Sequence, residues 1–133
     1  MSRRFQTFSV PESIAAPPDT TPWRIGGQAR CPIEHFEAIV AFTHQHFEAE
    51  GAFFEEAAVL DGRRLTPAQV VRLRALLIAL MAALPDAAPL TPVVTAEVLE
   101  PMPNTEHVRM LGEVLRVLEL SQASGEPFDS WVD

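Results

Sequence analysis

The chain has 133 residues, a length typical of one domain, and 47% of them are hydrophobic, which is enough to form a core. Its net charge of −8 disfavours a binder of nucleic acids or of anionic membranes, because both need clustered basic residues. A single cysteine excludes a disulfide within the chain and fits a reducing compartment, so we expect a cytoplasmic protein.

Residues 1–31 read as an extended tail. Four prolines within this stretch prevent a continuous helix. Phe5, Phe8 and Trp23 nevertheless give the tail large apolar side chains to bury. We expect an ordered tail to be held by contacts with its own domain or with a neighbouring chain.

Residues 32–58 carry apolar side chains at helical spacing, after a proline that suits a first helical turn. Gly51 is a place where this helix can bend or be interrupted. The apolar side chains cover about half of the helix circumference, whereas a surface helix needs a stripe only a little over ~100° wide. The helix is therefore expected either to be central in a bundle or to offer Phe42 and Phe53 to a partner.

A second helix is predicted from Thr66 to about Leu84. Thr66-Pro67-Ala68-Gln69 fits a capping box with proline at the first helical position, and Pro85 ends the helix. Its apolar run over 75–84 surrounds the helix but is too short to cross a bilayer. Because so small a bundle can surround few helices, we expect Leu77 and Met81 to meet another chain, unless the tail covers them.

Beyond this helix, residues 85–103 hold five prolines. The β-branched stretch 93–99 is compatible with a strand, while the preceding Thr-Pro slightly favours a short helix. Asn104 or Thr105 is expected to cap a last helix that ends at Ser124-Gly125.

The acidic tail over 126–133 carries Phe128 and Trp131. Aromatic anchors are frequent energetic centres of interfaces, and acidic flanks would steer them to a basic groove. The alternative is that the tail folds back and caps its own bundle.

One group of residues has metal-ligand character. On a continuous helix, His46 and Glu50 lie four residues apart and could bind one metal ion, or simply each other. His46-Phe47-x-x-Glu50 resembles the His-Phe-x-x-Glu helix of hemerythrins, and the resemblance implies that both residues are iron ligands. The predicted second helix has no histidine, so the family's following His-x-x-x-His pair is missing and one chain cannot complete a di-iron site. A single metal ion, or a site shared between subunits, stays open.

The remaining patterns nominate no reaction. The sequence has no Gly-rich phosphate loop, serine elbow or dinucleotide-binding fingerprint. Cys31 stands beside Arg30 at a predicted helix start, which lowers a thiol pKa, so a reactive thiol is the alternative to a packing residue.

These observations predict an all-α fold, a three- or four-helix bundle over 32–125 with extended tails at 1–31 and 126–133. We expect a non-catalytic accessory factor (an adaptor, assembly factor, inhibitor or immunity-type protein) that binds a protein partner or a second copy of itself, with no required cofactor. The alternatives are a bundle that binds a metal or small ligand at His46 and Glu50, and a small subunit of a larger enzyme complex. The residues expected to contact the partner are Phe42, Phe53, Leu77, Met81, Phe128 and Trp131.

Overall fold

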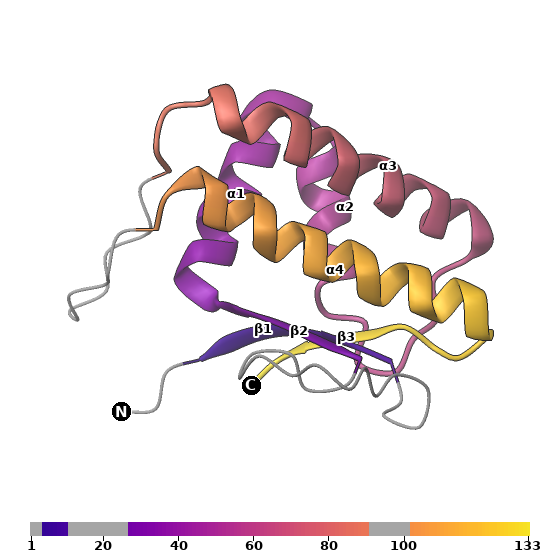
Figure 1. The fold of residues 1–133 in the computed structure, drawn as a ribbon. Coiled ribbons are helices and arrows are strands. Elements are labelled where there is room, and N and C mark those ends of the chain that lie inside the picture. Colours follow the sequence, from indigo (N-terminus) through magenta and orange to yellow (C-terminus); the bar gives the residue numbers. More distant parts are fainter. Residues whose placement is uncertain (1–3, 11–26, 91–101) are drawn as a thin grey trace.

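The computed structural model describes residues 4–10, 27–90 and 102–133 of the chain. Figure 1 shows a small sheet with the helices on one side of it, and α3 is the helix farthest from the sheet. The elements in chain order are β1 (Phe5–Ser9), β2 (Gln28–Pro32), α1 (Ile33–Phe47), α2 (Glu50–Ala57), α3 (Pro67–Ala83), the 3₁₀ helix η2 (Leu84–Asp86), α4 (Asn104–Ser124) and β3 (Asp129–Val132).

The all-α prediction is wrong, because both predicted tails contribute strands. β1 is the central strand of an antiparallel sheet with the order β2-β1-β3, so the first and last strands of the chain are neighbours. Alternation along β1 turns Gln6 and Phe8 toward the helices, where Gln6 Nε2 donates to Ala58 O over 2.6 Å and the Phe8 ring meets Phe36. The strands β1 and β3 are held because they bury these side chains and satisfy each other's backbone groups.

β3 also fixes the loop that follows α2. The Ser130 hydroxyl donates to Ala57 O over 2.6 Å and accepts from Leu60 N at 3.0 Å. Just before the strand, Phe128 is only 6% exposed and stacks on Phe8 at 5.9 Å between ring centroids. The C-terminal segment thus folds back onto its own chain, which was one of the two alternatives left open by the sequence.

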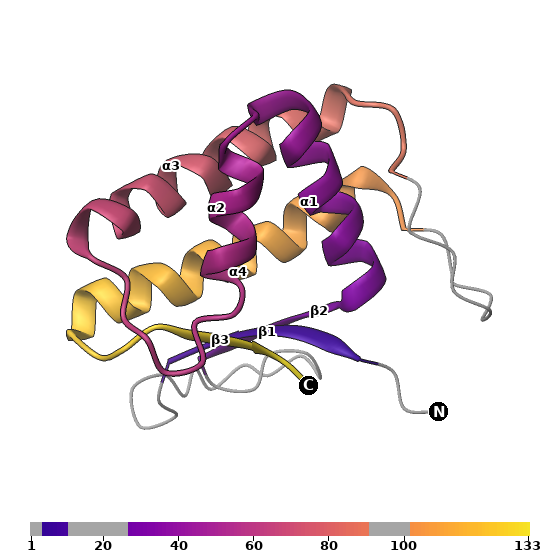
Figure 2. The same cartoon turned by 180° about the vertical axis from the view of Figure 1, so that it is seen from behind.

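The helix expected over 32–58 is interrupted. α1 ends at Phe47, Glu48 takes a positive φ of 48°, and α2 begins at Glu50. Gly51 is required beside this break, because a Cβ there would overlap the His44 ring. α2 therefore turns back to lie beside α1, as Figure 2 shows, and the two short helices cover apolar surface that one long helix would expose.

The predicted limits of α3 and the end of α4 are confirmed. Thr66 and Gln69 form the full capping box, with hydrogen bonds of 2.9 and 3.2 Å. α4 ends at Gly125, which has a φ of 75°. The cap expected at Asn104 or Thr105 is wrong: Pro103 precedes the helix, and the Asn104 amide donates to carbonyls around η2 instead. The undecided stretch 93–99 lies outside the described residues.

Candidate functional site

Most residues predicted to meet a partner lie inside the chain. Phe42 and Phe53 are 7% and 5% exposed, and Leu77 is fully buried. Met81 and Trp131 are half-buried, with Met81 packed against the core cluster. These side chains therefore offer less free apolar surface than the helix patterns suggested.

Phe53 is shielded by a side chain from the next helix. The Arg72 guanidinium of α3 lies 4.3 Å from the centre of the Phe53 ring, and its Nε donates to Glu50 Oε1 over 2.8 Å. This contact attaches α3 to α2 by a cation–π interaction and an ion pair together. It also occupies the carboxylate of Glu50, which the sequence suggested as a metal ligand.

The structure lacks the helical spacing on which the metal hypothesis rested. The break at Glu48 separates His46 from Glu50, and the His46 ring packs against Phe42 with 4.4 Å between ring centroids. Across residues 4–10, 27–90 and 102–133, no three His, Cys, Asp or Glu side chains are grouped so that they could hold a metal ion.

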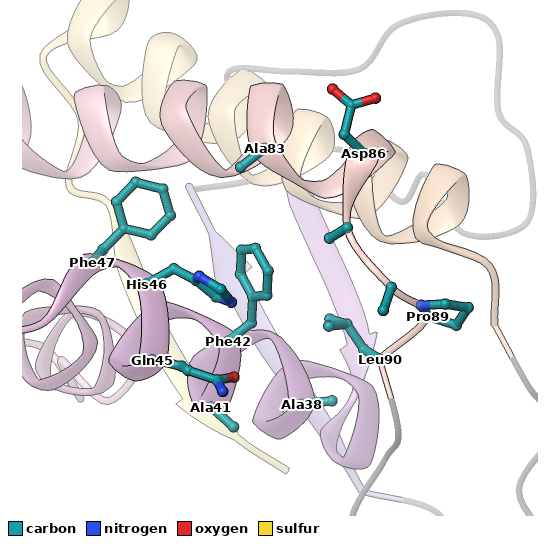
Figure 3. A pocket seen from close by; sticks show the side chains of 12 residues that line it. Ala38, Ala41, Phe42, Gln45, His46, Phe47, Ala83, Asp86, Pro89 and Leu90 are labelled. Atoms are coloured by element: carbon teal, nitrogen blue, oxygen red, sulfur yellow. The ribbon is translucent and has the colours of Figure 1, made fainter.

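His46 does border a cleft of about 590 Å³ between α1 and the chain that follows α3. Figure 3 shows Phe42, Phe47 and Leu90 around this space, whereas the Asp86 carboxylate points away from it. Ligand sites usually combine an apolar wall with several convergent polar groups. Here the lining is largely alanine and other apolar side chains, which does not specify a ligand.

A polar cluster is buried where the first turns of α1 and α4 meet. His107 Nε2 lies 3.4 Å from His35 Nδ1, and His107 Nδ1 lies 3.1 Å from Asn104 Oδ1. Because Asn104 Nδ2 donates to the carbonyls of Leu84 and Ala87, its Oδ1 must accept from His107 Nδ1. His107 Nε2 then accepts the proton of His35 Nδ1, so each ring is held in one tautomer.

The environment of His107 keeps that ring uncharged at neutral pH. Burial lowers the pKa of His107 to about 4, with a further contribution from His35 and a smaller opposing one from Glu106. His107 and His35 are 0% and 4% exposed. The pair therefore joins α1, α4 and η2 as a structural connection and presents no group to a substrate.

The reactive-thiol alternative also loses its basis. Cys31 lies on β2 rather than at a free helix end, and it is buried. Burial raises the pKa of its thiol well above the usual range, and the charge of Glu34 raises it further. The thiol stays protonated at neutral pH, and it packs as a small apolar side chain.

Among the described residues, the exposed large hydrophobic side chains are Val71 and Ile78 on the outer side of α3 and Val59 in the turn after α2. Val71 is 66% and Ile78 43% exposed, and Ala68, Ala75 and Ala82 are exposed at the same helical spacing. Steps of three and four residues place all five on one stripe, here called the outer stripe of α3. The opposite side of the helix is in the core and consists of the buried residues Leu73, Leu76, Leu77 and Leu80.

The sequence carried a signal for this stripe that was not used. The leucines at 73, 76, 77 and 80 and the alanine, valine and isoleucine residues at 68, 71, 75, 78 and 82 are two separate stripes on one helix. The leucines pack inside, and the second stripe remains outside. Leu77 and Met81 were the residues of α3 predicted to contact the partner, and Val71 was not among them.

Within the described residues, one helix is long and apolar enough to cross a membrane by length and composition, namely Pro67–Asp86. The window includes Arg72, which binds Glu50 of α2, and the leucines that form part of the core. These contacts fasten the helix to the rest of the fold.

Comparison of this chain with protein families, with curated proteins and with solved structures found no match. The resemblance to the hemerythrin helix thus has no support beyond its few residues. Function has to be argued from the surface that the fold leaves uncovered.

Proposed function

We propose that this chain is a protein-binding accessory factor that acts through the outer stripe of α3. The observation that carries the proposal is the exposure of Val71 and Ile78 on a stripe that is otherwise alanine. Scattered exposed apolar residues are ordinary, but a continuous apolar stripe on a helix is the usual form of a surface that receives another helix.

The chemistry of α3 fits a protein partner. Burying a side chain such as Val71 or Ile78 stabilises a complex by roughly 1–2 kcal/mol, since each is already partly covered. Alanines between them let a second backbone approach closely, because helix pairs with small contact residues reach the short end of the usual 8–10 Å separation. Pro67–Leu84 contains no acidic residue, although the whole chain has a net charge of −8.

A photo-reactive amino acid placed at Ile78 in the native host tests this proposal. Val59 is the matched control, because it is another apolar residue of similar exposure, 40%, in the turn after α2. We expect a discrete protein cross-link, to this chain or to another, from position 78 and none from position 59. Equal labelling from both positions, or none from either, would contradict the proposal.

A further inference from the structure

We infer that the outer stripe of α3 binds the same stripe of a second copy of this chain, with the two helices antiparallel across a two-fold axis. The inference rests on the proposed function, because it names the occupant of that surface. It follows from the order of large and small residues along the stripe and from the distribution of charge along α3.

The sizes of the residues are complementary in only one direction. With Ala75 set opposite Ile78 of the partner subunit, the two-fold axis also sets Val71 opposite Ala82 of the partner subunit. Every large side chain then meets a small one, as knobs-into-holes packing requires. A parallel pair would set Ile78 against Ile78 of the partner subunit and leave gaps between facing alanines.

The charges favour the same direction. Arg72 and Arg74 lie in the amino-terminal half of α3, and Asp86 follows its carboxyl end. An antiparallel pair places the amino-terminal half that carries Arg74 against the negative end of the partner's helix dipole, while Arg72 stays paired with Glu50 of its own chain. A parallel pair would bring Arg74 against Arg74 of the partner subunit.

The same surface also keeps the acidic parts of two subunits apart. Two chains of charge −8 repel each other, and contact through any acidic surface would add to that repulsion. α3 has no acidic residue between Pro67 and Leu84, and the neighbouring Glu50 is paired with Arg72, so the helix itself adds no unpaired carboxylate to the interface.

The extent of the stripe sets the expected strength. From Ala68 to Ala82 it is roughly 21 Å long at 1.5 Å per residue. One helix pair of that length falls below the area of a standard stable interface, so the dimer should be in reversible exchange with monomer. Its sedimentation coefficient should rise with protein concentration.

Disulfide trapping tests the geometry, with the wild-type chain as the background because Cys31 is buried. In an antiparallel pair, position 71 faces position 82 of the other subunit, and two copies of position 71 are roughly 16 Å apart along the axis. Neither Val71→Cys nor Ala82→Cys alone should therefore form a disulfide-linked dimer. An equal mixture of the two variants should do so on mild oxidation.

Each other outcome overturns the inference in a recognisable way. Efficient cross-linking of Val71→Cys alone means that the helices are parallel. If no disulfide-linked dimer forms and the chain is a monomer at every concentration, no second copy binds. In that case a photo-cross-link from position 78 to a different protein leaves the proposed function intact. Binding to phosphatidylcholine–phosphatidylglycerol vesicles that Ile78→Asp removes, with no protein cross-link, would instead reject both.

Discussion

The two sides of α3 have similar compositions and opposite environments. Leu77 and Leu80, on the inner side, are fully buried, whereas Val71 and Ile78, on the outer side, are 66% and 43% exposed. α4 and α2 cover the leucines, and no element of the described chain covers the other stripe. Hydrophobicity alone thus does not distinguish the core side of α3 from its exposed side; the positions of α4 and α2 decide it.

The largest effect should come from truncating the inner side. Leu77→Ala removes a fully buried side chain from the core, which costs about 2–5 kcal/mol in the free energy of unfolding. Urea unfolding followed by circular dichroism measures the loss. A change below about 1 kcal/mol would mean that the inner side is less tightly packed than the burial indicates.

Acid should weaken the buried polar contact between α1 and α4 next. His107 has an ordinary pKa of 6.5 when unfolded and about 4 when folded, so the unfolded state binds more protons between these values. The stability contributed by keeping His107 neutral is present above pH 6.5 and is lost as the pH falls toward 4. The expected loss is at most about 3 kcal/mol, from 1.36 kcal/mol per pKa unit.

Urea unfolding at several pH values measures that contribution. His107→Gln should flatten the pH dependence between 6.5 and 4. The same slope in the His107→Gln variant as in the wild type would show that His107 does not titrate differently in the two states.

A smaller loss of stability is expected from Arg72, which lies between the inner and outer sides of α3. Arg72→Ala uncovers Phe53 and leaves Glu50 without its ion-pair partner, so the melting temperature should fall, though by less than in Leu77→Ala. Arg74→Ala is the matched control on the same helix. Equal melting temperatures for the two variants would show that the Arg72 contact contributes nothing to the fold.

The smallest effect on folding should come from the outer side itself. Ile78→Ala should lower the unfolding free energy of the monomer by about 1 kcal/mol, less than Leu77→Ala does, because 43% of the Ile78 residue surface stays exposed within one chain. Dilute samples, in which the monomer predominates, are the appropriate material. A loss similar to that of Leu77→Ala would remove the distinction between the two sides.

Local signals allowed part of the fold to be predicted. The capping box at Thr66 and the glycine after Ser124 mark helix ends through contacts a few residues long, and both were confirmed. The sheet was missed because its pairing is not local: β1 pairs with β3 over a separation of more than a hundred residues. Five residues such as Phe5–Ser9 do not identify their partners by themselves.

The candidate site was only partly predictable for the same reason. The excess of apolar residues on α3 was visible in the sequence, but the exposed side depends on where α4 and α2 pack. Phe53 was assigned to a partner because a straight helix would have exposed it. The break at Glu48, made with Gly51, lets α2 fold back so that Arg72 covers it.

The most direct measurement is sedimentation velocity of the wild-type chain and of Ile78→Asp over a range of concentrations, with Val59→Asp as the control. We predict a reversible monomer–dimer equilibrium for the wild type and for Val59→Asp, and at least about tenfold weaker association for Ile78→Asp, since a buried charge costs more than 1.4 kcal/mol. A dimer that Ile78→Asp leaves unchanged, or a wild type that is monomeric throughout, would contradict self-association through the outer stripe of α3.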